Sequence, residues 1–151
     1  MKKLILLTLL MFLCGCASVD VPKYIKDDHP YKKTVYADFD EVFQATVKIL
    51  KEFGWEVSGT SDPSVFERTA SGGDPQQKQI LIFSKVRQMS LVLGSRYARI
   101  NVYIRGKADS ETEIEFRYVN VSSVFVKDFY NYRKDHLVDR MLQHIESLVK
   151  G

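Results

Sequence analysis

The sequence predicts an α+β domain in which an antiparallel sheet of four to five strands carries two helices packed on one face. Apolar residues recur at helical spacing near both ends of the chain, in residues 39–53 and 127–150. Between them, residues 97–107 and 113–118 alternate between apolar and polar side chains, the pattern of half-buried strands. The expected order is β-α-β-β-β-β-α. Placing both helices on one face of the sheet is the simplest way to bury both patterns.

The first expected strand, residues 34–38, leads into the more clearly defined of the two helices. Asp38 occupies the N-cap position, and Glu41 three residues later completes the pattern of a capping box. Gly54 is expected to end the helix, because a left-handed residue is needed there. The apolar side of the helix consists of Phe39, Val42, Phe43, Thr46, Ile49, Leu50 and Phe53.

Turn-forming residues divide the middle of the chain into short strands. Asp62-Pro63 marks one turn, and the glycine-containing residues 71–77 form another that does not match a phosphate-binding loop. Residues 84–95 are apolar without a clean period, so they continue a strand, form a helical turn or make the apolar lip of a cleft. The short strands expected before the long alternating segment are 55–57, 65–70 and 80–83.

The strand at 97–107 and its partner at 113–118 each have two distinct faces. Because residues of the same face must pair, Arg105 is expected beside Glu113 or Glu115, in exposed ion pairs worth under ~1 kcal/mol that fix the register. The apolar face consists of Ala98, Ile100, Val102 and Ile104. The solvent face is expected to carry Arg99, Asn101, Tyr103, Arg105, Glu113, Glu115 and Arg117. Residues 119–125 extend the strand or bend into the last helix.

The first sixteen residues have the organisation of a lipoprotein signal. Lys2 and Lys3 precede an apolar run, residues 4–13, that is too short to cross a bilayer as a helix, which needs ~20 residues. The run ends in Leu13-Cys14-Gly15-Cys16, which resembles the lipobox of bacterial lipoproteins. The resemblance implies that the chain is cut between Gly15 and Cys16 and that Cys16 carries the lipid. The alternative is an ordinary secretory signal cut at the same small residue.

The expected organisation is a signal peptide, residues 1–15, a lipidated tether, residues 16–33, and one α+β domain, residues 34–151. Fully extended, the tether would reach ~55 Å. Ala17 and Ser18 follow the cysteine with no aspartate. By resemblance to lipoprotein sorting in enterobacteria, this implies attachment to the periplasmic face of the outer membrane, with the inner membrane as the alternative.

Composition argues against several classes of function. Without Lys2 and Lys3 the chain has 20 basic and 19 acidic side chains, so it lacks the electrostatic signature of a nucleic-acid-binding protein. Cutting would remove Cys14 and lipidation would occupy Cys16. Disulfides, thiol catalysis and cysteine-based metal sites are therefore not expected.

Candidate catalytic and metal-binding groups are few. His136 and His144 are eight residues apart on the expected last helix, too far to share a metal ion, and His29 lies in the tether. Glu113 and Glu115 are neighbouring acids on one strand face, but the interleaved arginines favour an ionised, solvated surface over acid–base chemistry. Neither a nucleophile motif nor a dinucleotide-binding motif is present in the sequence. The sequence therefore predicts a non-enzymatic protein with no cofactor and no metal.

A contact surface is expected from Tyr103, Tyr132 and Arg133, because tyrosine and arginine are enriched at protein interfaces. The junction Phe53-Gly54-Trp55-Glu56-Val57 and the order of elements resemble the domains of BamC-like outer-membrane lipoproteins. That resemblance implies a domain that serves in protein contacts.

The leading interpretation is a lipid-anchored binding or scaffolding module of the bacterial cell envelope, with an envelope protein as its partner. The alternative is a carrier or sensor of a small apolar ligand in a pocket between sheet and helix, with residues 86–93 at its lip.

Overall fold

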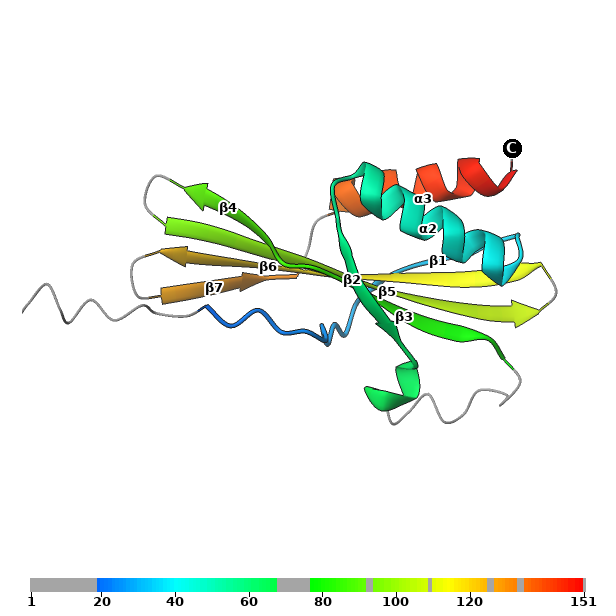
Figure 1. Cartoon of the computed structure of the whole chain (residues 1–151), viewed down its shortest axis with the longest axis horizontal. Coiled ribbons are helices and arrows are strands. Elements are labelled where there is room, and N and C mark those ends of the chain that lie inside the picture. The colour runs from blue at the N-terminus through cyan, green and yellow to red at the C-terminus, as the bar shows by residue number, and fades with distance from the viewer. Residues whose placement is uncertain are drawn as a thin grey trace, which may run out of the picture.

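The computed structural model of the chain describes residues 19–67, 77–91, 94–108, 110–124, 127–132 and 135–150. They form an α+β fold in which two helices lie on one face of a seven-stranded antiparallel sheet (Figure 1). The predicted fold class is confirmed, but the sheet is larger than the four to five strands expected. In chain order the elements are β1 (Tyr31–Val35), α2 (Phe39–Glu52), β2 (Val57–Ser61), the 3₁₀ turn η1 (Pro63–Val65), β3 (Gln79–Ser84), β4 (Arg87–Leu91), β5 (Gly94–Ala108), β6 (Glu111–Val124), β7 (Lys127–Asn131) and α3 (Asp135–Lys150).

Two long strands, β5 and β6, run the length of the sheet and belong to both of its halves. In one half the strand order is β1-β6-β5-β3-β2, and in the other β4 pairs with β5 and β7 pairs with β6. Arg105 lies opposite Glu113, which confirms the predicted register. The second half projects beyond the helices (Figure 1). We call it the β-arm: β4, β7 and the residues paired with them, 94–98 of β5 and 120–124 of β6.

The β-arm contains the two strands that the sequence pattern does not predict. β4 lies within residues 84–95, where no single conformation was favoured. β7 occupies the first residues of the expected last helix, and α3 instead begins at Asp135. All five residues of β7 pair in register with β6, so inter-strand pairing outweighs the local helical spacing. Val65 ends η1 rather than beginning a strand, and residues 68–70 of that expected strand lie outside the described residues.

Helix α2 begins and ends where the sequence predicts, but one detail of its start is different. Asp38 is the N-cap residue, yet its side chain makes no capping hydrogen bond. Its Oδ1 instead accepts a hydrogen bond from Ser110 Oγ at 3.1 Å, so the expected capping box is wrong. Gly54 adopts φ of +75°, which confirms the left-handed residue predicted after the helix.

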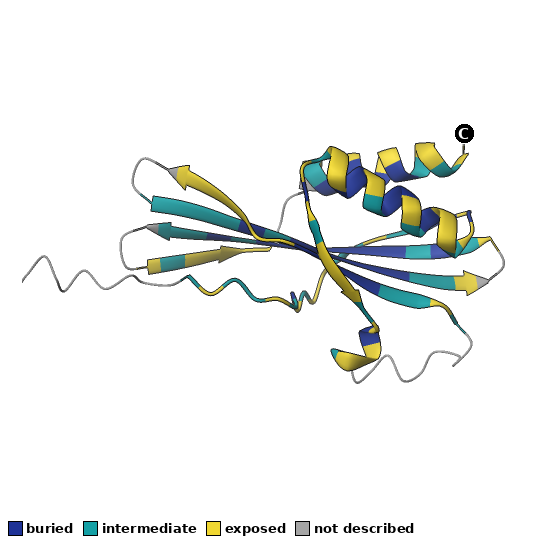
Figure 2. Cartoon of the chain, viewed as in Figure 1, coloured by how far each residue is buried: buried dark blue, intermediate teal, exposed yellow. Residues whose placement is uncertain are grey.

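Figure 2 shows that β5 and β6 are buried where the helices lie over them. The even-numbered side chains within 98–104 of β5 and 114–118 of β6 pack there with side chains of both helices in the main hydrophobic core. Burying each of these large apolar side chains contributes about 1.5–3 kcal/mol relative to exposing it. Side chains that are at most 1% exposed in this core include Ile100, Val102, Ile104, Ile114, Phe116, Val42, Ile49, Met141 and Ile145. The predicted apolar face is therefore confirmed.

The opposite face of the sheet is covered by residues 19–30, which we call the N-terminal strap. Ile25 is fully buried against Val119 and Val121, and its backbone N–H donates to Asn101 Oδ1 at 2.7 Å. The expectation of a solvent-exposed face is therefore wrong, because four of its seven residues are 7% exposed or less: Asn101, Tyr103, Glu115 and Arg117.

A buried ionic cluster lies beneath the strap. Arg117 pairs with both Glu115 and Glu67, and it also donates a hydrogen bond to the Tyr24 hydroxyl. Lys32 of β1 pairs with the other oxygen of Glu115 at 3.0 Å. The sequence predicts exposed ion pairs of Arg105 with Glu113 or Glu115. In the structure Glu115 is buried and pairs with Arg117 and Lys32, and Glu113 pairs with Lys107. The predicted partners are therefore wrong, and so is the predicted exposure of Glu115.

The strap also leaves little of the chain as a free tether. Residues 31–33 begin β1, and residues 19–30 pack along the sheet.

In the described ranges, neither helix is long and apolar enough to cross a membrane.

Candidate binding pocket

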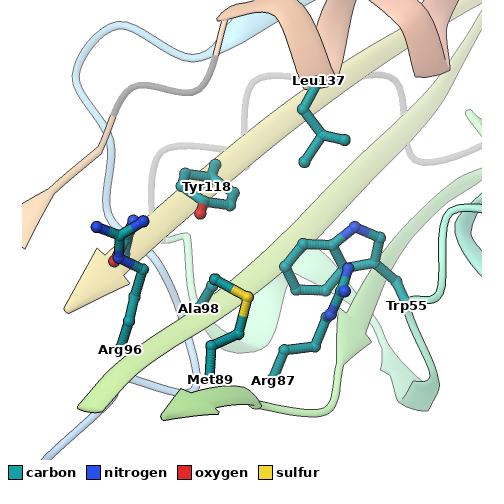
Figure 3. A pocket seen from close by; sticks show the side chains of 8 residues that line it. Trp55, Arg87, Met89, Arg96, Ala98, Tyr118 and Leu137 are labelled. Atoms are coloured by element: carbon teal, nitrogen blue, oxygen red, sulfur yellow. The ribbon is translucent and has the colours of Figure 1, made fainter. Parts of the chain in front are cut away.

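A pocket of about 180 Å³ lies where the β-arm leaves the helices (Figure 3). Its walls come from the segment after α2, from β4, β5 and β6, and from the start of α3. The lining residues are Trp55, Arg87, Met89, Arg96, Ala98, Tyr118, Asn120 and Leu137.

Trp55 is held in the pocket wall by the turn that ends α2. The left-handed conformation of Gly54 reverses the chain, and the Trp55 backbone N–H donates to Leu50 O at 2.7 Å. The indole is only 2% exposed and meets Tyr118 edge-on, with ring centroids 6.2 Å apart. The local sequence Phe53-Gly54-Trp55 therefore fixes one side of the pocket.

The strand register brings the polar lining residues together. Arg87 of β4 lies opposite Ala98 of β5, which lies opposite Asn120 of β6. Two residues further along, Met89 lies opposite Arg96. Because side chains alternate along a strand, all of these project on the side of the sheet that carries the helices.

The pocket carries two positive charges. The Arg87 guanidinium stacks over the Trp55 ring at 4.7 Å and donates to Phe53 O at 3.2 Å. Within the part of the chain that the structure describes, neither Arg87 nor Arg96 forms an ion pair with a carboxylate. The pocket therefore favours an anion.

Tyr118 is a neutral member of this wall. Burial raises the pKa of its hydroxyl, although Arg96, the hydrogen bond with Asn120 and Arg87 each act to lower it. The net direction is upward, away from neutral pH, so the phenol is protonated at neutral pH. It contributes a polar group without adding charge.

Three polar atoms of the pocket are buried without a hydrogen-bond partner. They are Trp55 Nε1, Arg96 Nε and Asn120 Oδ1, and the described residues contain only one other such side-chain atom, Arg99 Nε. Buried polar groups are nearly always paired with protein, water or ligand, so this concentration is unusual. The arrangement suits binding of a hydrogen-bonding anion. It does not place a nucleophile beside a base.

The structure separates the residues of the expected contact surface. Tyr103 is 3% exposed, and its hydroxyl donates to Gln79 Oε1 at 2.8 Å and accepts from Arg105. Tyr132 is 39% exposed at the end of β7. Burial therefore removes Tyr103 from that surface, while Arg133, Gly15 and Cys16 lie outside the described residues.

The two acids singled out from the sequence are both ion-paired. Glu113 pairs with Lys107 at 2.9 Å; its burial alone would raise the carboxyl pKa, but Lys107, Arg105 and Lys32 together lower it. Glu115 belongs to the buried ionic cluster. In the described ranges, no three metal-ligating side chains gather into a cluster.

The sequence identified part of this pocket but not its centre. The ligand-carrier interpretation predicts residues 86–93 at the lip of a pocket, and Arg87 and Met89 of that range line this one. Trp55, Arg96 and Tyr118 were missed as pocket residues, because their meeting depends on long-range strand pairing. The available signal was the single tryptophan placed directly after a helix-ending glycine.

Comparison with known proteins adds no family to this description. No family model matches the chain, and no curated protein is significantly similar to it.

Proposed function

We propose that the chain is a non-enzymatic protein-binding module of the bacterial cell envelope, anchored by lipid on Cys16 to the periplasmic face of the outer membrane. The supporting observation is the distribution of exposed apolar side chains. Of the eight large ones that are exposed in the described residues, five lie in or directly beside β4 and β7: Val86, Met89, Phe129, Tyr130 and Tyr132. Such clustering on a projecting element is typical of an interaction surface.

The register arranges part of this surface into a continuous row. Met89 lies opposite Arg96, Arg96 opposite Ser122, and Ser122 opposite Phe129. Met89 is 47% exposed and Phe129 is 52% exposed. Methionine, arginine and phenylalanine, three of the four residues of this row, are types enriched at protein interfaces.

The position of the strap supports a partner located at the membrane. Val19 and Val21 pack against the cluster of Ile25, Val119 and Val121, and Asp20 O accepts a hydrogen bond from Tyr130 of β7. Cys16 is three residues before Val19, a distance of at most ~11 Å in extended chain. A lipid on Cys16 would therefore keep the β-arm close to the bilayer, where a membrane-associated protein would meet it.

Replacing Cys16 by serine tests the anchor. We expect Cys16→Ser to lose palmitate labelling in cells and to leave the membrane fraction, because the thioether cannot form. The matched control is Cys14→Ser, which should keep both, since serine suits that position of a lipobox. Labelled, membrane-bound Cys16→Ser protein would contradict the anchor.

Photo-cross-linking in intact cells tests the surface. A photoreactive phenylalanine at position 129 is expected to give one defined envelope-protein adduct. Met89→Ser in the same row should weaken that adduct several-fold. A photoreactive residue at Lys48, exposed on α2, is the control and should not give it. Equal products from positions 129 and 48, or none from 129, would contradict binding through the β-arm.

The alternative function, carriage of a small ligand, is supported by the pocket beside the β-arm. Its cationic lining changes the expected ligand from a purely apolar molecule to an anionic one.

A further inference from the structure

We propose that the pocket between Trp55 and Arg96 binds small organic carboxylates in which the carboxylate is attached to a compact aromatic or aliphatic group. This inference deepens the ligand-carrying alternative. It does not require protein binding by the β-arm, although Met89 and Arg96 belong both to the pocket and to the row described above.

The first argument is the charge of the pocket. Arg87 and Arg96 both line it, and in the described part of the chain neither has a carboxylate partner. By contrast, Arg117 on the other face is paired with two glutamates. Arg96 is partly buried, so leaving it without a counter-charge is costly, and an anion entering the pocket would offset that cost. Arg87 is exposed and adds a second positive charge at the pocket.

The second argument is the set of unused hydrogen-bonding atoms. Trp55 Nε1 and Arg96 Nε are donors that find no acceptor. A carboxylate has two oxygens that accept several hydrogen bonds, and bonds from arginine to a carboxylate are short and strong. Asn120 can offer either its oxygen or its amide nitrogen, because the two ends of an amide are interchangeable by rotation.

The third argument is the apolar part of the lining. Trp55, Met89, Ala98 and Leu137 present indole, thioether and aliphatic surface around the polar atoms (Figure 3). The pocket volume is about 180 Å³. A cavity of ~150 Å³ holds a benzene molecule, so an aromatic ring with a short acid group is an appropriate size. Large lipids are too big for this space.

Ordered water is the competing occupant. Water molecules satisfy unpaired buried groups in many proteins when at least two polar partners are available. Water alone would satisfy the same atoms without any preference for an anion. The charge of the bound molecule therefore separates the two explanations.

Trp55 is the only tryptophan in the chain, so its fluorescence reports directly on the pocket. The experiment uses the chain from residue 16 onward with Cys16→Ser, which retains every residue of the described fold. Phenylacetate is titrated and compared with 2-phenylacetamide, which has nearly the same shape but no charge. We expect saturable binding of phenylacetate, at least tenfold tighter than binding of the amide.

Arg96→Gln is the test variant, because it removes one of the two positive charges while leaving the Arg87–Trp55 stack in place. We expect it to weaken phenylacetate binding at least tenfold. Arg140→Gln is the matched control: Arg140 is exposed on α3, does not line the pocket, and should bind as the unmodified chain does. Ala98→Leu should abolish binding, because the larger side chain fills the cavity. Calorimetry gives a second measurement of binding that does not depend on fluorescence.

Three results would overturn the proposal: no saturable binding of phenylacetate, equal binding of the acid and the amide, or unchanged affinity in a folded Arg96→Gln. The absence of saturable binding would leave water as the occupant. Equal binding of the acid and the amide would indicate an apolar pocket with no preference for an anion. Tyr132→Ser, directly after β7 and outside the pocket, should leave the titration unchanged. Absence of the cross-link from position 129 together with a normal titration of the unmodified chain would contradict the protein-binding function alone.

Discussion

Arg117→Leu is expected to destabilise the protein by about 3–5 kcal/mol, the cost of leaving buried carboxylates without their cation. Arg117 is 7% exposed and pairs with Glu115, which is 4% exposed, and with Glu67. The leucine would leave Glu115 with only Lys32, whose side chain is 54% exposed. An exposed lysine compensates a buried carboxylate poorly.

The pKa values of the cluster follow from the same contacts. Burial lowers the pKa of Arg117, but Glu115 and Glu67 outweigh it, so the net direction is upward. Burial and the hydrogen bond to Glu67 raise the pKa of the Tyr24 hydroxyl, which stays protonated and donates to that carboxylate at 2.7 Å. Two acids, two cations and a neutral phenol thus form a cluster without net charge.

Urea unfolding at neutral pH measures the effect, with the slope checked for a two-state transition. The control is Arg140→Leu on the exposed surface of α3, where the guanidinium lies over the Phe53 ring at 5.7 Å, so we expect a loss of no more than about 1 kcal/mol. The double variant Glu115→Met, Arg117→Leu should recover part of the loss, because removing both charges leaves fewer buried groups unpaired. A loss below about 1 kcal/mol for Arg117→Leu would show that water reaches the cluster.

The buried ionic cluster marks where sequence reasoning stopped being sufficient. Alternation in β5 and β6 correctly separated two faces and placed Ile100, Val102 and Ile104 toward the helices. The other face looked exposed because charged residues are rarely buried unless they are paired. Whether Arg117 is paired depends on the strap and on Glu67, which lie far from it in the chain. Local periodicity carries no information about either.

The β-arm was unpredictable for a related reason. The spacing of apolar residues from 127 onward is compatible with a helix, and only the ladder between β6 and β7 decides in favour of a strand. The pocket could not be predicted for the same reason, because its lining comes from three neighbouring strands and two helix ends. Of its residues, only Trp55 is placed by a local signal, the glycine that ends α2. The turn that ends α2 could be predicted from the sequence, whereas the strand pairing could not.

Ile25→Asp is expected to release the N-terminal strap and to destabilise the fold by at least the ~2–5 kcal/mol typical of losing a buried large aliphatic side chain. Ile25 belongs to the strap, and its side chain is fully buried against Val119 and Val121 of β6. An ionised aspartate cannot stay there without a partner, so the strap should detach instead of burying the charge. The main core between the helices and the sheet contains no strap residue and should remain folded.

Trypsin measures the release, because Lys23 and Lys26 are exposed but lie in a strap that hydrogen bonds at Val21, Lys23 and Ile25 hold on the sheet. Ile25→Asp should be cut at these sites much faster than the unmodified chain. The control is Asp28→Ser, an exposed change in the same segment that should leave the cleavage rate unchanged. Slow cleavage of a folded Ile25→Asp chain would mean that Ile25 does not hold the strap.

Releasing the strap also tests whether the short anchor matters for function. With the strap bound, Cys16 lies within ~11 Å of the packed chain; with it released, residues 16–30 could extend to ~50 Å before β1 begins. If the partner is met at the membrane surface, the cross-link from position 129 should fall several-fold in Ile25→Asp although the protein stays lipidated. An unchanged cross-link would mean that the β-arm finds its partner independently of the bilayer, and that the strap serves stability alone.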